Sequence, residues 1–200
     1  MSDSEPEQSP VSTGEATAPR NRVRLRRLMR WAERFFAVLG VCFLIYHVCF
    51  ELTAMTTDSM APTLRGTSYK NGDRILIEKV SAWFRRPRRW EIYFYYNADG
   101  MPVAKRIVGL PGEIVSLKDK KIYIDGKLSD PPDDLKNLTY YAFGNLSAGR
   151  EVNCEQGYYV LGDDSRDSYD SRFLGPVSRQ EFRGRAWCVV WPISRFGMVR

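Results

Sequence analysis

The chain has 200 residues, of which 44% are apolar and 27% charged, and its formal net charge is +6. This composition excludes a wholly disordered chain and leaves room for one folded domain with an appendage. A positive charge is compatible with nucleic acid binding, so its distribution along the sequence decides what it means.

The first 55 residues divide into an acidic tail, a basic segment and an apolar run. Residues 1–19 contain four acids and no Lys or Arg, which predicts a disordered tail. Residues 20–34 contain seven arginines, and the uncharged run Phe35–Phe50 follows. Extension to Met55 gives 21 residues, which is long enough to cross a membrane. We therefore expect residues 20–55 to hold a basic flank and a transmembrane helix.

The position of the arginines predicts the orientation of this anchor. Basic flanks stay in the cytoplasm, which predicts a single-pass plasma-membrane protein whose residues 56–200 lie outside the cytoplasm. A cleaved secretory signal is an alternative, but the leader would be long and no clear small-residue cleavage site follows. A buried core helix is disfavoured because the run has no polar face. The bilayer is then an expected partner, and nucleic acid is not.

Residues 56–200 consist of short strand-like runs separated by turn signals, without a sustained helical period. Two of these runs flank a three-residue turn and are typical of a hairpin. We expect a mainly β fold of antiparallel sheets in a barrel-like or sandwiched arrangement, with residues 129–155 as an irregular surface insertion. The runs are Arg74–Lys79, Glu91–Tyr96, Met101–Gly109, the hairpin pair Glu113–Leu117 and Lys121–Ile124, Gly157–Asp163 and Arg185–Pro192.

The densest basic patch of this part is Arg85–Arg89, flanked by Trp83, Phe84 and Trp90. The patch is typical of a solvated loop, and it is also compatible with anionic lipid headgroups beside the anchor.

The cysteine and histidine content limits the metal and redox chemistry. Cys154 and Cys188 fall in the exported part, where a disulfide is permitted, but the sequence does not decide whether they pair. There is neither a Cys-x-x-Cys motif nor a His cluster, so a zinc site has no support. We expect no metal and no cofactor.

Ser59, in the segment TTDSMAPTL, is either a nucleophile or a turn residue. A serine hydroxyl needs a base, and the one histidine, His47, lies inside the apolar run, which argues against a Ser-His-Asp triad. The base would then be a carboxylate or a lysine. Lys105 lies in an apolar strand whose alternation places Val103, Lys105 and Ile107 on one face. Burial would lower its pKa, whereas a lysine at a strand edge would reach water.

Peptide hydrolysis also needs hydrogen-bond donors for the oxyanion. The local candidates are the backbone N–H of Ser59 and the hydroxyl of Thr57, which is equally compatible with a turn.

Four segments occur in the order and character of the type I signal peptidases, also called leader peptidases. The sequence resembles this family over most of residues 56–196, with residues 129–155 outside the resemblance. The resemblance implies a membrane-bound serine endopeptidase that removes signal peptides from secretory preproteins, and association with secretion machinery is compatible with it. The segments are SMAPTL (Ser59–Leu64), NGDRILIEK (Asn71–Lys79), AKRIVGLPGE (Ala104–Glu113) and LGDDSRDSYDSRFLGPV (Leu161–Val177).

Carried over position by position, the resemblance implies that Ser59 is the nucleophile and Lys105 the general base of a Ser/Lys dyad. Thr57 matches the residue whose hydroxyl helps to form the oxyanion hole, and Ser168 matches the serine that orients the lysine amine. Three further residues match positions that hold the site together: Asp163, Asp170 and Arg172.

The chain also departs from the family pattern. Asp58 precedes the nucleophile where glycine is common, and its carboxylate could oppose the oxyanion unless it points away. Asp164 and Asp167 stand where Asn is frequent, and Leu174 replaces a usual aromatic residue. These changes bear on substrate preference more than on reaction type.

Three other functions compete with this one, of which a structural envelope protein would give Ser59, Lys105 and Ser168 no reason to occur together. A catalytically inactive, membrane-tethered β-domain that binds peptides or partners is the main alternative, and Asp58 is the residue that favours it. A self-cleaving repressor-type Ser/Lys protease is disfavoured by the anchor.

Overall fold

The computed structural model describes residues 20–66, 72–97, 100–147 and 149–199. The chain divides into two compact units, Met1–Leu44 and Ile45–Arg200. The predicted disordered tail, residues 1–19, lies outside the described residues.

One long helix, α1 (Arg20–Cys49), begins in the arginine-rich segment and runs through the apolar one. Its part Arg22–Cys49 is long and apolar enough to cross a membrane. The predicted extension of the membrane segment to Met55 was wrong, because Phe50–Ala54 forms strand β1. This stretch pairs along its whole length with the strand Arg74–Glu78, and that pairing ends the helix.

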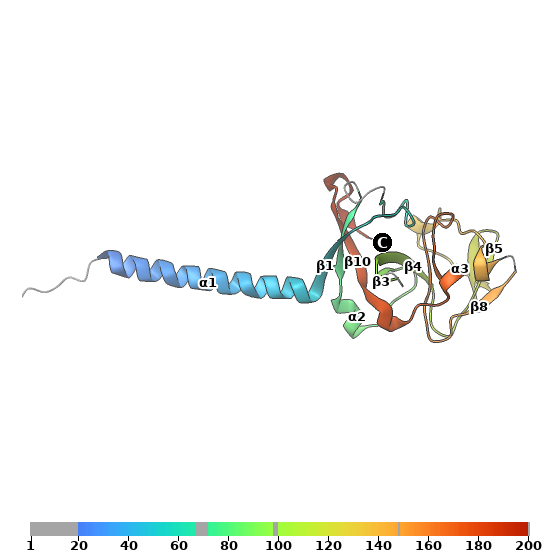
Figure 1. The fold of residues 1–200 in the computed structure, drawn as a ribbon, viewed down its shortest axis with the longest axis horizontal. Coiled ribbons are helices and arrows are strands. Elements are labelled where there is room, and N and C mark those ends of the chain that lie inside the picture. The colour runs from blue at the N-terminus through green and yellow to red at the C-terminus, as the bar shows by residue number, and fades with distance from the viewer. Residues whose placement is uncertain (1–19, 67–71, 98–99, 148, 200) are drawn as a thin grey trace, which may run out of the picture. The chain divides into compact units, whose positions relative to one another are not determined.

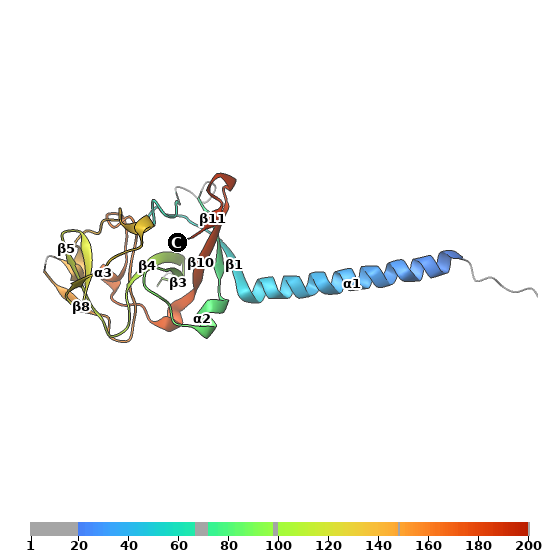
Figure 2. The same cartoon turned by 180° about the vertical axis from the view of Figure 1, so that it is seen from behind.

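The unit Ile45–Arg200 contains two antiparallel sheets, with β1 and β10 at one end and β5 and β8 at the other (Figure 1). The larger sheet has the order β1-β2-β10-β3-β4-β9, and β11 pairs with β10, beside which it lies in Figure 2. Its strands after β1 are β2 (Arg74–Glu78), β3 (Ile92–Tyr96), β4 (Pro102–Gly109), β9 (Tyr159–Leu161), β10 (Phe182–Trp191) and β11 (Gly197–Met198).

The smaller sheet has the order β7-β6-β5-β8. The predicted hairpin is confirmed, since β5 and β6 pair antiparallel from Val115 opposite Ile124 to Lys118 opposite Lys121. Its turn residues Asp119 and Lys120 have φ values of 50° and 61°. The strands are β5 (Ile114–Lys118), β6 (Lys121–Ile124), β7 (Lys127–Leu128) and β8 (Glu151–Asn153).

The mainly β, antiparallel fold class is therefore confirmed, and the sheets that the structure describes form no closed barrel. Helices of this unit, after the end of α1, are short. They are α2 (Val80–Phe84), α3 (Ser171–Leu174) and the 3₁₀ turns η1 (Asp133–Leu135), η2 (Gly144–Leu146), η3 (Arg179–Glu181) and η4 (Ile193–Arg195).

The segment 129–155 is not merely an irregular surface insertion, as predicted. It supplies β8, which pairs with β5. Its Tyr140 and Leu146 are buried in one apolar cluster with Val115 and Tyr159. Burial of these large apolar side chains stabilises the fold, and in a solvated loop this stabilisation would be lost.

The remaining sequence expectations concern cysteines and the basic patch. Cys154 and Cys188 are both buried and free, so the structure contains no disulfide between them. Two arginines of the patch form ion pairs rather than lying in solvent: Arg85 with Glu91 and Arg89 with Glu113, each at 2.6 Å.

Strand β4 positions the site. It lies between β3 and β9, and all its residues from Ala104 to Gly109 are buried. Successive side chains of a strand point to opposite faces, so Lys105 and Arg106 are buried on different sides of the sheet. Lys105 is only 3% exposed, so the strand-edge alternative is wrong and the buried orientation is confirmed.

Candidate active site

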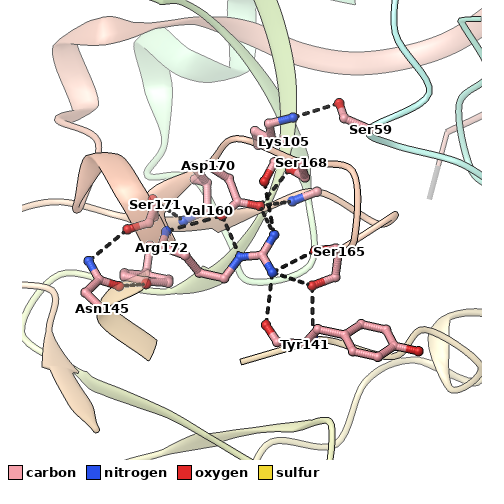
Figure 3. Close-up of polar contacts among 12 residues, drawn as sticks. Ser59, Lys105, Tyr141, Asn145, Val160, Ser165, Ser168, Asp170, Ser171 and Arg172 are labelled. Atoms are coloured by element: carbon pink, nitrogen blue, oxygen red, sulfur yellow. Dashed lines mark hydrogen bonds and ion pairs between the residues drawn. The ribbon is translucent and has the colours of Figure 1, made fainter. Parts of the chain in front are cut away.

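The Lys105 amine and the Ser59 hydroxyl point toward each other (Figure 3). Ser59 lies in the loop after β1 and Lys105 in the middle of β4. Lys105 Nζ donates a hydrogen bond to Ser59 Oγ at 2.7 Å. Both side chains are buried, so the contact is shielded from bulk water.

Burial changes the proton affinity of the amine. It lowers the pKa of Lys105 from its ordinary 10.5 to about 8, and the carboxylates of Asp170 and Asp163 oppose part of that fall. An ammonium ion loses hydration when it enters the protein, which favours its neutral form. With a pKa of about 8, roughly a tenth of the amine is neutral at pH 7. A neutral amine at this distance can accept the proton of a serine hydroxyl.

The loop around Ser59 presents two hydrogen-bond donors. Thr57 Oγ1 lies 3.3 Å from Ser59 Oγ. Within the described residues, the backbone N–H of Ser59 donates to no acceptor. Asp58 points away from this group, because its Oδ1 accepts a hydrogen bond from the backbone N–H of Gly66 at 2.8 Å. The carboxylate therefore stabilises the loop instead of facing the donors.

A cleft of about 310 Å³ opens at this pair of residues. Its lining includes Thr57, Ser59 and Lys105, together with Val103, Tyr169 and Leu174. A space of this size accommodates a few small side chains of a peptide, in direct contact with the serine hydroxyl.

Behind the cleft, Asp163 and Arg106 form an ion pair in which both side chains are fully buried. Arg106 donates from Nε and Nη2 to the two carboxylate oxygens at 2.8 and 2.7 Å. Thr63, in the loop that carries Ser59, donates to Asp163 Oδ2 at 2.5 Å. This pair therefore fixes the serine loop against β4 and the segment after β9.

A second buried ion pair, Asp170 with Arg172, organises the segment below the amine (Figure 3). Asp170 Oδ2 accepts hydrogen bonds from Ser168 Oγ at 2.7 Å and from the backbone N–H of Gly162 at 3.0 Å. Arg172 Nη1 donates to Tyr141 O at 2.9 Å and to Ser165 O at 2.7 Å. Arg172 therefore connects the segment around Ser168 to residues 129–155, and Asp170 connects the same segment to the end of β9.

Gly162 brings the serine loop and Ser168 into close contact. A Cβ at this position would lie 2.5 Å from Ser59 O and 2.2 Å from Ser168 Oγ. The next residues continue the contact, since the backbone N–H of Asp164 donates to Ser59 O at 3.1 Å. The Ser168 hydroxyl donates a hydrogen bond to Asp170, which leaves its oxygen lone pairs able to accept another hydrogen bond. Its predicted role of orienting Lys105 stays a prediction.

The structure thus brings the seven predicted site residues into one region, and it adds others that the sequence reasoning missed. Arg106 could have been found, because an arginine in a strand buried on both faces needs a partner. Thr63 and Tyr141 gave no local signal. Asn145 likewise gave none, although its side-chain N–H donates to Ser171 O at 3.0 Å and its Oδ1 accepts a hydrogen bond from the Tyr159 hydroxyl.

Known proteins share this sequence pattern. The family described as "Signal peptidase, peptidase S26" matches residues 28–191. A protein of Synechocystis sp. named "Probable signal peptidase I-2" is 33% identical over 156 residues, which cover 74% of this chain and 66% of that protein. Signal peptidase I of Leptolyngbya laminosa is 32% identical over 162 residues, covering 74% and 71%.

A third relative, signal peptidase I S of Bacillus subtilis, is 29% identical over 175 residues, covering 84% of this chain and 92% of that protein. The chain thus spans just under two thirds of the Synechocystis protein and a larger share of the other two.

Proposed function

The chain belongs to the signal peptidase family, peptidase S26, and on this premise we propose that it is a membrane-bound serine endopeptidase that removes signal peptides from exported preproteins. The observation that carries this proposal is the buried contact of 2.7 Å between Lys105 Nζ and Ser59 Oγ. It supports a Ser/Lys dyad in which Ser59 is the nucleophile and Lys105 the general base.

In the proposed reaction the neutral Lys105 amine takes the proton of Ser59 as Oγ attacks the carbonyl carbon of the scissile bond. The ammonium formed then donates that proton to the departing amine. A water molecule, deprotonated by the same lysine, releases the acyl group and restores the serine. The lowered pKa of Lys105, about 8, supports this role, because an amine with the ordinary value would hold its proton.

The developing oxyanion needs donors aimed at it from a rigid loop. We assign this role to the backbone N–H of Ser59 and the Thr57 hydroxyl, which lies 3.3 Å from Ser59 Oγ. The orientation of Asp58 toward Gly66 supports the assignment, since it keeps negative charge away from these donors. It also removes the argument for an inactive binding domain.

The supporting residues keep this geometry in place. Asp163 and Thr63 would hold the serine loop, and Asp170 with Arg172 would hold the segment of Ser168, whose hydroxyl would orient the lysine. These groups would act by lowering the cost of reorganisation, because the dyad is already aligned before substrate binds.

For the location, we propose a single-pass plasma-membrane protein. The arginine-rich start of α1 would lie in the cytoplasm and the catalytic unit on the other side, in agreement with the distribution of basic residues. The site would then meet preproteins whose signal helices lie in the same bilayer. Tethering enzyme and substrate to one membrane raises their effective concentration. Association with secretion machinery is compatible with this location.

Cleavage of a preprotein by the full chain in detergent micelles tests the proposal. The wild type is expected to cut at one site, and Ser59→Ala and Lys105→Ala are each expected to abolish cutting. Exposed residues of the same types provide controls, Ser194→Ala and Lys127→Ala, which should keep wild-type rates. Binding of preprotein without cleavage by the wild type would instead establish the inactive binding domain.

A further inference from the structure

Asp167 places an unpaired negative charge in the cleft. Among the cleft-lining residues that the structure describes it is the one acid, and its side chain is exposed. Its backbone N–H donates to Asp164 O at 3.2 Å, but its carboxylate has no hydrogen bond or ion pair with any described residue. The neighbouring Arg166 does not neutralise it, because that guanidinium lies over the ring of Tyr141, 5.6 Å from its centre.

Two other acids close to the site are engaged elsewhere. Asp58 Oδ1 accepts from the Gly66 N–H, and Asp164 Oδ1 accepts from the Arg166 N–H at 3.2 Å. Neither lines the cleft. Of the three acids that depart from the family pattern, Asp167 is therefore the one whose carboxylate is available to a bound peptide.

Tyr169 adds an aromatic surface to the same cleft. Tyr169 is 67% exposed, and its ring stacks on that of Phe173, with centroids 5.2 Å apart and an interplanar angle of 14°. Stacking restricts the orientation of the ring before a ligand binds. A carboxylate and an accessible aromatic face are the two groups that attract a lysine or arginine side chain.

We propose that Asp167 and Tyr169 form a specificity subsite for a cationic side chain of the preprotein, close to the scissile bond. The enzyme then cleaves a preprotein with Lys or Arg at that position faster than one with Asp or Glu. This inference rests on the proposed function and deepens it by naming a substrate preference. Because Asp167 is solvent-exposed, the preference is modest, roughly threefold to tenfold in kcat/KM between Lys and Glu.

The influence of Asp167 on the catalytic lysine supports its closeness to the reacting atoms. Burial lowers the pKa of Lys105, while Asp170, Asp163 and Asp167 raise it and Arg172 lowers it further. Lys105 and Asp167 line the same cleft, so the charge of Asp167 also acts on substrate residues that occupy the cleft.

The test uses one preprotein in which a single position near the scissile bond carries Lys, Gln or Glu in turn. Three positions are compared: the second before the bond and the first two after it. The full chain in detergent micelles is assayed as wild type, Asp167→Asn, Tyr169→Leu and Asp164→Asn. The last is a matched control, since it makes the same chemical change outside the cleft.

At one of the three positions the wild type is expected to prefer Lys to Glu threefold to tenfold. Asp167→Asn should bring this ratio close to one, Tyr169→Leu should reduce it, and Asp164→Asn should keep it. Raising the salt concentration should weaken the wild-type preference. A ratio near one at every position in an active wild type, or an unchanged ratio in Asp167→Asn, overturns the subsite and leaves the peptidase assignment intact. Failure of the wild type to cleave any preprotein overturns both.

Discussion

Lys105 Nζ lies 2.7 Å from Ser59 Oγ, although the two residues are 46 positions apart in the sequence. Both side chains are buried. The distance alone would be an ordinary hydrogen bond. Burial makes this contact relevant to catalysis, because it lowers the pKa of the Lys105 amine to about 8. Part of the amine can then act as a base at a pH where exposed lysines are fully protonated.

The pH dependence of cleavage should report this amine. With a pKa of about 8 for Lys105, kcat/KM is expected to rise about tenfold per pH unit below that value and to level off above it. The measurement is the rate of preprotein cleavage between pH 6 and 10 at constant ionic strength. A rate that stays constant from pH 6 to 8 would contradict Lys105 as the base.

Burial of the Lys105 amine should also lower the free energy of unfolding at neutral pH. Its folded-state pKa, about 8, lies below the ordinary 10.5, so between these values the unfolded chain binds more protons. Stability must therefore rise with pH across this window. Lys105→Met removes the cost, and we expect it to raise the free energy of unfolding at pH 7 by about 2–3 kcal/mol.

Denaturant titrations of wild type and Lys105→Met, followed by tryptophan fluorescence in detergent, measure this difference. The difference in the free energy of unfolding between the two proteins should become smaller from pH 8 to 10.5. The exposed Lys127→Met is the control and should show no such trend. Equal stabilities of wild type and Lys105→Met at pH 7 would mean that the buried charge carries no penalty.

The buried pair of Arg106 and Asp163 should behave differently in single and double variants. Arg106→Met leaves a buried carboxylate without its partner, which is expected to cost about 3–5 kcal/mol of stability. The double variant Arg106→Met with Asp163→Leu should recover at least half of that loss, yet cleave slowly because Thr63 loses its acceptor. Unfolding and cleavage assays on all three proteins check this, and full activity in the double variant would show that Thr63 needs no such bond.

Gly162 should tolerate no side chain. A Cβ there would lie 2.5 Å from the backbone oxygen of Ser59, which cannot move without displacing the proposed nucleophile. Gly162→Ala is therefore expected to lower kcat/KM by roughly one to two orders of magnitude. Gly197→Ala is the control, because no described atom outside residues 196–198 lies within 4 Å of the added carbon. Comparable activity of the two variants would mean that the serine loop is not held against this position.

The hydrogen bond of Asp58 predicts opposite outcomes for two substitutions. Asp58→Asn keeps an acceptor for the Gly66 N–H and should leave the cleavage rate within about twofold. Asp58→Ala leaves that N–H unsatisfied and should cost about 1 kcal/mol of stability and slow cleavage. A large gain in rate from Asp58→Asn would indicate that the carboxylate opposes the oxyanion after all.

Local patterns were enough to predict much of this molecule. The apolar run, the alternating strands and the β5–β6 hairpin follow from side-chain periodicity, which neighbouring residues alone can express. The assignment of Ser59 and Lys105 followed from the shortage of other bases and from the family resemblance. The end of α1 was misplaced, because residues 50–54 become a strand only through pairing with Arg74–Glu78.

The sequence alone was sufficient to predict the fold class and to propose Ser59 and Lys105 as the reacting groups, because composition, short motifs and the family resemblance point to both. How these two side chains are held became visible only in the folded chain. The pairing of Asp163 with Arg106, the bond from Thr63 and the direction of Asp58 depend on how β4, β9 and the serine loop pack together. The partners of a buried polar group are set by sheet register and loop packing across tens of residues, and no local pattern encodes them.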